Sequence, residues 1–86
     1  MKVLLIDDDP SSLQALQRYL HDPFGYEVVT AANCEEGLAT FQEQDISIVL
    51  SDIRMEGMSG LEMLERIKAS GKGPGTDVVL MTGFGD

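Results

Sequence analysis

The sequence predicts an α/β protein in which a parallel sheet has helices on both faces. Four short apolar runs alternate with three stretches of helical periodicity, and this alternation is typical of strands joined by helices. The chain has 86 residues, of which 43% are apolar and 24% charged, so it fits one small globular domain. We find no internal repeat.

The first strand and the first helix are expected at residues 3–6 and 10–21. Residues 3–6 are all apolar, which favours a strand that is buried on both faces. Asp9 is a suitable N-cap, the proline that follows suits the first helical turn, and three leucines recur at helical spacing. Pro23 and Gly25 should then stop the helix.

The second strand is expected at residues 26–31, and its more polar composition places it near an edge of the sheet. Asn33 and Glu36 have the spacing of a capping box, so they predict the start of a second helix. This helix carries Leu38 and Phe41 on one face.

The third and fourth strands are expected at residues 46–50 and 78–81. Between them, Ser59 and Glu62 form another capping-box pattern, which predicts a third helix. The apolar face of this helix is expected to consist of Leu61, Leu64 and Ile67.

Acidic residues and one hydroxyl follow three of the predicted strands. Asp7 and Asp8 follow the first strand, Asp52 follows the third, and Thr82 follows the fourth. Parallel α/β sheets form their sites at the carboxyl ends of the strands, so these side chains should gather at one edge. Asp9 lies beside them but is interpreted as a helix cap only.

Such a cluster of carboxylates needs a proton or a cation. Two carboxylates about 5 Å apart repel each other by roughly 3 kcal/mol at an effective dielectric constant near 20. Oxygen ligands favour Mg²⁺, Ca²⁺ or Mn²⁺ over zinc, and Mg²⁺ also binds phosphate groups. A carboxylate beside the metal can act as a nucleophile toward a phosphoryl group.

Composition excludes several other functions. The net charge of -9 disfavours non-specific binding to nucleic acid or to an anionic membrane surface. The single cysteine, Cys34, excludes an internal disulfide and a cysteine zinc site. Its place at a helix start allows a lowered thiol pKa, although a small packing residue is the preferred interpretation. The apolar N-terminal run stops at three aspartates, which disfavours a secretory signal.

Four segments together resemble the receiver domain of bacterial two-component response regulators. They are LLIDDDPSSLQALQRYL, VVTAANCEEGLATF, ISIVLSDIRMEGMSGLEML and DVVLMTGFGD. The resemblance implies a flavodoxin-like fold in the cytoplasm, a sensor histidine kinase as phosphoryl donor and an output domain that is regulated. It implies no enzymatic activity beyond the domain's own phosphorylation and dephosphorylation. The ending MTGFGD is similar to transcription activators of the nitrogen-regulation class.

The resemblance also assigns roles to individual residues. Asp52 matches the phosphoacceptor, and Asp7 and Asp8 match the acidic pair that binds Mg²⁺ together with Asp52. The backbone carbonyl of Arg54 matches a further ligand of the metal. Thr82 matches the switch hydroxyl that moves toward the phosphoryl group.

The sequence departs from the family pattern in its loop and at its end. Glu56 stands where the family usually has a proline, which leaves the loop beside Arg54 less stiff. A fourth helix, a fifth strand and a fifth helix are absent, together with a lysine for which neither Lys68 nor Lys72 is a substitute. We therefore expect residues 1–86 to be the N-terminal portion of a receiver domain, truncated to four strands and three helices.

This truncation leaves two alternatives. The open edge of the fourth strand is expected to pair with another copy, giving a homodimer or a strand-exchanged oligomer. The fragment would then be a phosphorylation-incompetent binding or self-associating module. Residues 7–11 also slightly resemble the nucleophile motif of haloacid-dehalogenase-type phosphatases, with Asp7 as nucleophile, but the chain is too short for that fold.

Overall fold

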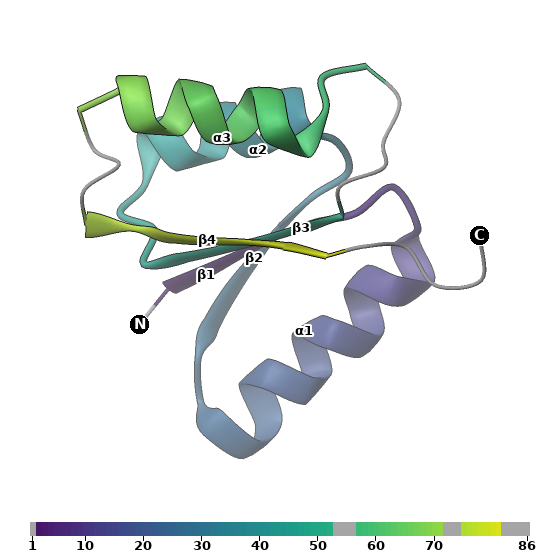
Figure 1. The fold of residues 1–86 in the computed structure, drawn as a ribbon. Helices are drawn as coiled ribbons and strands as arrows, with labels where there is room; N and C mark the ends of the chain where they lie inside the picture. Colours follow the sequence, from purple (N-terminus) through teal and green to yellow (C-terminus); the bar gives the residue numbers. More distant parts are fainter. Residues whose placement is uncertain (1, 53–56, 72–74, 82–86) are drawn as a thin grey trace.

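The computed structural model describes residues 2–52, 57–71 and 75–81, which form four strands and three helices. The strands are parallel and lie in the order β2-β1-β3-β4 (Figure 1). The elements are β1 (Lys2–Ile6), α1 (Pro10–Phe24), β2 (Glu27–Ala31), α2 (Cys34–Glu43), β3 (Ile48–Asp52), α3 (Gly60–Ala69) and β4 (Asp77–Met81).

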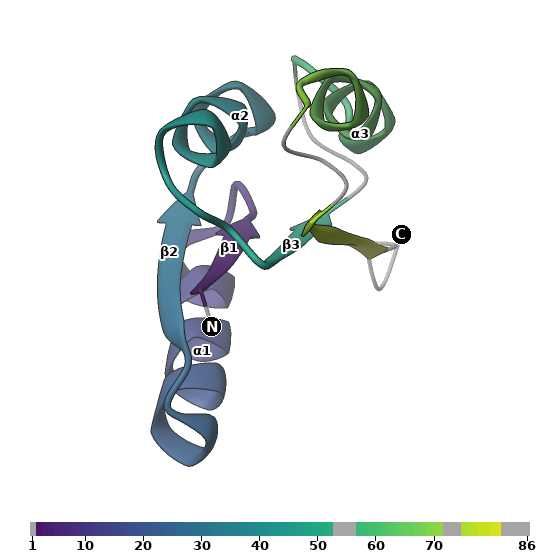
Figure 2. The same cartoon turned by 90° about the vertical axis from the view of Figure 1, so that its left-hand side faces the viewer.

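The helices form a layer on each face of the sheet. α1 packs against β1 and β2 on one face, whereas α2 and α3 lie side by side on the other (Figures 1 and 2). This arrangement confirms the predicted fold class, and β2 lies at an edge of the described sheet as its polar composition indicated. Among the described residues, no helix is both long and apolar enough to cross a bilayer.

The core lies mainly between the sheet and the pair α2 and α3. β1 is central, and its four apolar residues are almost completely buried, as the continuous apolar run predicted. Side chains alternate along a strand, so β1 contributes to both faces. The cluster on the α2 and α3 side consists of Leu4, Ile6, Ala31, Cys34, Phe41, Ile46, Val49, Met63 and Ile67.

Helix α1 is longer than predicted. It continues through Pro23 to Phe24 and ends at Gly25, whose φ of 69° is left-handed and whose N–H bonds to the His21 carbonyl at 2.7 Å. Pro23 lies in the last turn, where its missing N–H removes little of the helix. Gly25 therefore sets the end of the helix, because glycine adopts the left-handed conformation without a steric penalty.

Strand β3 begins two residues later than predicted. Ile46 is buried in the core, but its carbonyl accepts a hydrogen bond from the Thr76 hydroxyl at 2.8 Å. The strand pairing with β4 starts at Ile48, which is opposite Asp77. The apolar run from Ile46 thus predicted burial correctly, but it did not predict that the strand begins at Ile48.

The apolar face of α3 differs from the predicted one. Leu61 is 54% exposed, whereas Gly60, Met63 and Ile67 are buried. These three follow the i, i+3, i+7 spacing of one helix face, and Leu61 lies about 100° away from Gly60 around the helix axis. Leu64 is partly buried. Ser59 is confirmed as the N-cap of α3, because its hydroxyl accepts the Glu62 N–H at 3.1 Å.

Candidate functional site

The carboxyl ends of β1 and β3 lie next to each other in the sheet. Ile6 of β1 is in register with Ser51 of β3, so Asp7 and Asp52 are the next residues on neighbouring strands, which are about 4.8 Å apart. The chain leaves β1 through α1 on one face and reaches β3 through α2 on the other. Such a reversal of direction is where ligands bind in open α/β sheets.

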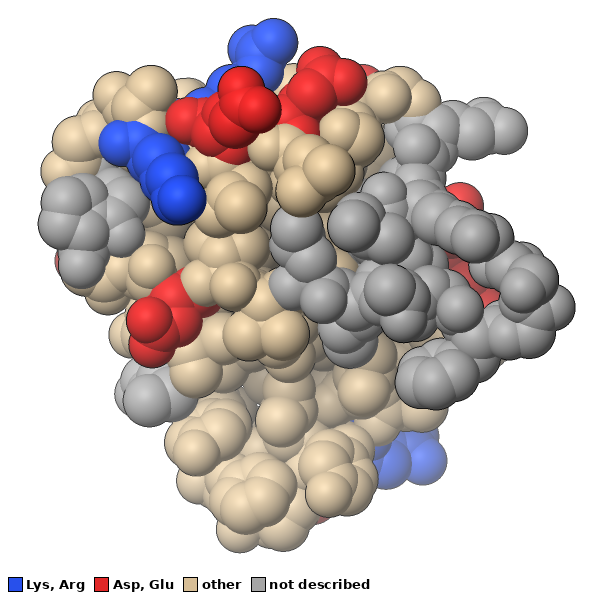
Figure 3. Space-filling view, in the orientation of Figure 1, with Lys and Arg blue, Asp and Glu red and all other residues tan. Residues whose placement is uncertain are grey.

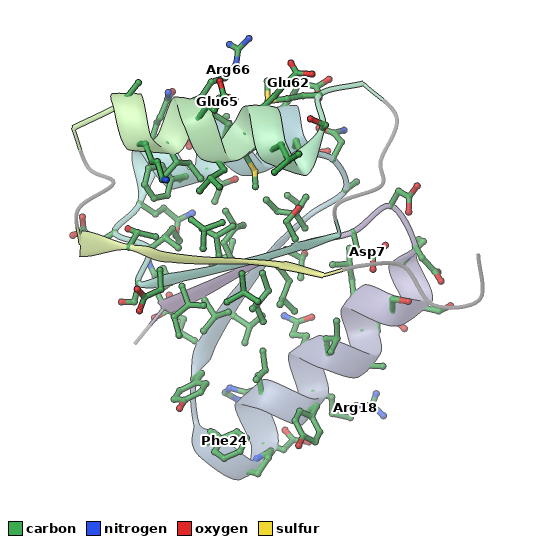
Figure 4. All side chains as sticks on the ribbon, in the orientation of Figure 1. Asp7, Arg18, Phe24, Glu62, Glu65 and Arg66 are labelled. Atoms are coloured by element: carbon green, nitrogen blue, oxygen red, sulfur yellow. The ribbon has the colours of Figure 1, made fainter. Side chains whose placement is uncertain are left out.

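The three N-terminal aspartates have different environments. Asp7 is partly buried, and its Oδ1 atom accepts a hydrogen bond from the Asp9 N–H at 3.0 Å (Figure 4). Asp8 is exposed. Asp9 is the N-cap of α1, because its carboxylate accepts from the Ser11 N–H and the Ser12 hydroxyl at 3.0 and 3.2 Å. The interpretation of Asp9 as a cap is confirmed.

The remaining predicted site residues lie partly or wholly outside the described part of the chain. Asp52 is the last residue of β3 and its backbone pairs with Met81, the last residue of β4. Its side chain is outside the described atoms, as are Arg54 and Thr82. Thr82 directly follows Met81 in the sequence. The structure thus places the backbone of Asp52 beside Asp7, while the positions of Arg54 and Thr82 stay predictions.

Behind this edge, a buried polar contact joins α2 to β3. Cys34 and Ser51 are both fully buried, and their side chains are hydrogen-bonded. Burial raises the pKa of the Cys34 thiol, the Ser51 hydrogen bond lowers it, and the charges of Glu35 and Glu62 raise it further. The net pKa shift is upward, with burial as its largest cause, so the possibility of a lowered pKa at this helix start is wrong.

One contact at the edge was missed by the sequence analysis. The Oε1 atom of Glu35, in the first turn of α2, accepts the Met58 N–H at 3.2 Å, just before α3. Gly57 also lies against this carboxylate and has a φ of 82°. The two partners are 23 residues apart, and no local pattern in the sequence indicates such a long-range contact.

Other charged side chains point away from this edge. Glu62, Glu65 and Arg66 project from the outer side of α3, where acidic and basic groups gather at the top of Figure 3 (Figures 3 and 4). A hollow of about 560 Å³ lies between the later part of α1 and the start of β2, at the opposite edge of the sheet from Asp7. Neither feature adds a ligand to the aspartates.

The residues predicted at this edge have the chemistry that a hard divalent cation requires. The predicted donors would be carboxylate oxygens from two neighbouring strands, which suit Mg²⁺ better than zinc. Among the side chains that the structure describes, no three metal-binding groups come together. The predicted metal ligands include Asp52, whose side chain lies outside the described atoms. The support for a metal site here is therefore the backbone register, which makes Asp52 a neighbour of Asp7.

Comparisons with known proteins agree with this geometry. A family model for the response regulator receiver domain matches residues 3–86. The C4-dicarboxylate transport transcriptional regulatory protein DctD of Rhizobium meliloti is 40% identical over 84 residues, which are 98% of this chain and 18% of DctD. The transcriptional regulatory protein GlrR of Escherichia coli is 37% identical over 83 residues, 96% of this chain and 18% of GlrR. The chain thus spans about a fifth of these regulators.

A solved structure is similar over nearly the whole chain. The response regulator protein TrrA of Thermotoga maritima, determined in complex with Mg²⁺ and BeF, superposes with a TM-score of 0.85 at 34% sequence identity. The match covers 98% of this chain and 70% of the TrrA chain. The fold described above therefore occurs in a protein whose structure contains Mg²⁺.

Proposed function

Because the chain belongs to the response regulator receiver domain family, we propose that Asp52 accepts a phosphoryl group from a sensor histidine kinase. As a receiver, the chain is a module of two-component signal transduction. The observation that carries the assignment to Asp52 is the register between β1 and β3, which makes Asp7 and Asp52 neighbours at one sheet edge. This is where a nucleophilic carboxylate would lie beside metal-binding carboxylates.

In the proposed transfer, an Asp52 carboxylate oxygen attacks the phosphorus of the kinase phosphohistidine. The new oxygen–phosphorus bond forms as the nitrogen–phosphorus bond breaks, and the imidazole nitrogen leaves with the electron pair. Asp7, Asp8, Asp52 and the Arg54 carbonyl would hold Mg²⁺. The metal would offset negative charge on the phosphoryl oxygens. The Thr82 hydroxyl would then hydrogen-bond to one of those oxygens.

In the whole protein, the receiver would act by regulating a separate output domain. Since the chain spans 18% of DctD and of GlrR, we propose that residues 1–86 are the N-terminal portion of a receiver that relays its phosphorylation state to a transcriptional output domain. Its only chemistry would be its own phosphorylation and dephosphorylation. The histidine kinase would be the donor, and the site of action would be the cytoplasm.

Phosphorylation of the 86-residue chain tests this function directly. Incubation with a ³²P-labelled histidine kinase and Mg²⁺ should label the wild type, and Asp52→Asn should remove the label. Asp45→Asn is the matched control, because Asp45 is an exposed aspartate in the connection before β3. Labelling that survives Asp52→Asn, or a wild type that is never labelled, would contradict the proposal.

A second function, self-association without phosphorylation, is supported by the outer edge of β4. Among the described residues, no strand lies beyond β4, and Val79 on this strand is 46% exposed. An open apolar strand edge pairs readily with another strand, so we propose a second copy of the chain as its partner. Leu50 is opposite Val79 and extends the same sheet face.

Two measurements separate the candidates. Light scattering should give a mass that rises with concentration, and Val79→Lys should restore a monomer, whereas Leu61→Lys on the exposed side of α3 should not. A monomeric wild type at all concentrations would contradict self-association. Titration with Mg²⁺ and beryllofluoride, followed by amide NMR, should perturb signals near Asp52 and Thr82; no change there would favour the second function over the first.

A further inference from the structure

We propose that the outer edge of β2 binds an extended peptide in which acidic and apolar residues alternate, so that the peptide adds another strand to the sheet. The inference does not rest on the proposed phosphorylation, because it concerns the start of β2 and one side of α1. It depends on two observations, an open backbone edge and a polar hollow beside that edge.

The first observation is the open edge of β2. In the described sheet, β2 pairs only with β1. The Ala31 carbonyl accepts the Asp7 N–H at 3.2 Å, so the odd-numbered residues of β2 bond toward β1. The N–H and C=O groups of Val28 and Thr30 therefore point outward, where no other described strand pairs with them. β2 also contains no lysine or proline, which commonly block such an edge.

The second observation is the hollow of about 560 Å³ that lies beside this edge. Figure 2 shows β2 at the margin of the sheet, with α1 on one face and α2 on the other. The wall of the hollow on the α1 side consists of exposed polar side chains at the i, i+3, i+4 and i+7 positions of one helix face, namely Gln14, Gln17, Arg18 and His21. Glu27 and Val28 line the other wall, so a strand added to β2 would run along the hollow.

The charges in the hollow favour an acidic partner. Arg18, which projects from α1 in Figure 4, makes no ion pair within the described part of the chain. Glu27 is already paired with the Lys2 Nζ atom at 3.3 Å. The Tyr26 carbonyl accepts a hydrogen bond from His21 Nδ1 at 3.0 Å, which holds the imidazole ring beside the edge. A carboxylate is the group that the Arg18 guanidinium binds most strongly among ordinary peptide side chains.

The two faces of the sheet determine where the acidic residues of the peptide would lie. Side chains of an added strand alternate between the faces, as they do in β2. Those beside Val28 and Thr30 would lie on the α1 face, toward Arg18. Those beside Val29 would lie on the α2 face, where Val29 packs against the core and is partly exposed. Carboxylates therefore suit the first set of positions and apolar side chains the second.

A second copy of β2 would fit this edge less well. On the α1 face it would present Val28 and Thr30 to the hollow, and neither side chain supplies a carboxylate for Arg18. The alternating acidic peptide satisfies the open backbone groups and also neutralises the arginine.

The probe is a capped peptide as long as β2, five residues, in which valine and glutamate alternate. Added to the 86-residue chain at millimolar concentration and followed by amide NMR, it should shift the Val28 and Thr30 signals, because their N–H groups would donate to it. The matched control peptide has lysine in place of glutamate and should bind more weakly. Added salt should weaken binding of the glutamate peptide.

Three variants test the two parts of the site. Arg18→Gln keeps a polar side chain without the charge, and it should bind the glutamate peptide about two- to fivefold more weakly. Arg66→Gln, on the outer side of α3, is the control and should match the wild type. Thr30→Pro removes one outward N–H and should weaken binding of both peptides. Proline is tolerated on an edge strand where its missing N–H faces solvent, and circular dichroism checks that each variant folds.

Four results would overturn the inference. They are the absence of any shift in β2, equal affinity for the glutamate and lysine peptides, unchanged affinity in Arg18→Gln, and shifts confined to β4, the other open edge of the described sheet. Shifts at Val28 and Thr30 on concentrating the chain without peptide would make a second copy the occupant, and would also overturn it. Labelling of Asp52 does not depend on this edge, so the inference can fail while the proposed function holds.

Discussion

The side chains of Cys34 and Ser51 are hydrogen-bonded to each other in the interior, where both residues are 0% exposed. Cys34 is the first residue of α2, and Ser51 is the residue before Asp52 in β3. The contact therefore ties the start of a helix to the strand end that carries the proposed phosphoacceptor. An interior polar contact of this kind stabilises the fold only while both partners are present.

The Cys34–Ser51 pair should show a measurable coupling energy. We expect the losses of unfolding free energy in Cys34→Ala and in Ser51→Ala to add up to more than the loss in the double variant. The difference is the coupling energy, about 0.5–1.5 kcal/mol. Urea unfolding followed by circular dichroism gives the free energies for all four proteins. Strictly additive effects would mean that the hydrogen bond contributes no stability.

The Cys34 thiol should be protected from alkylation, and its ionisation should destabilise the fold. Burial raises its pKa above the ordinary value of 9.0, so the neutral thiol is favoured in the folded state. The resulting stability is fully present below the unfolded pKa and is lost as the pH rises through the folded pKa. Urea midpoints measured from pH 7 to 11 should fall more steeply for the wild type than for Cys34→Ser.

The alkylation rate supplies the corresponding kinetic check. Iodoacetamide should modify Cys34 slowly in buffer and rapidly in urea, because the thiolate that reacts is formed only when the chain opens. A rate in buffer equal to that in urea would contradict the buried, raised-pKa thiol.

Substitution of Gly37 by alanine should destabilise the protein although alanine favours helices. A Cβ at Gly37 would overlap the Ile6 Cδ1 atom and lie 2.8 Å from Cγ1. Ile6 is buried and stiff at χ1, so it has little room to yield, and overpacking of this kind costs about 1–3 kcal/mol. This exceeds the gain of up to about 1 kcal/mol in helix propensity.

Truncation of the neighbour should relieve part of that cost. Ile6→Val removes the overlapping methyl group, so the double substitution should be more stable than the sum of the two single effects predicts. Chemical unfolding provides the comparison. A Gly37→Ala protein at least as stable as the wild type would show that the helix shifts away from β1 without penalty.

The sequence predicted most of the fold because the physical signals were local. The apolar run of β1 and the caps Asp9, Asn33 and Ser59 each act within a few residues, and the structure confirms all of them. Errors arose where a tertiary contact decided the outcome. Leu61 has the spacing of a core residue, but the direction in which α3 meets the sheet buries Met63 instead.

The site was predictable only as far as strand topology determines it. Parallel strands have their carboxyl ends at one edge, which was sufficient to bring Asp7 and Asp52 together along the backbone. Contacts across the fold were not predictable, since Glu35 and Met58 share no motif and meet only after α2 and α3 have packed. The raised pKa of Cys34 likewise depends on burial that no local pattern reveals.

Asp8 and Asp9 are adjacent acids that should separate into different roles. Asp9→Ala removes the cap of α1 and should lower the free energy of unfolding by about 1 kcal/mol, while Mg²⁺ affinity changes little. Asp8→Asn should do the opposite, because Asp8 is exposed and its carboxylate is a proposed metal ligand. Urea unfolding and Mg²⁺ calorimetry on the same two proteins measure both properties.

These two roles follow from what each carboxylate bonds to. The Asp9 carboxylate is held by the first turn of α1 through Ser11 and Ser12, and Asp7 is bonded to the Asp9 backbone, which alanine preserves. Asp9→Ser, which restores a cap without a charge, should recover the lost stability. If Asp9→Ala instead weakened Mg²⁺ binding as strongly as Asp8→Asn, the cap would be acting as a metal ligand and the division between them would be wrong.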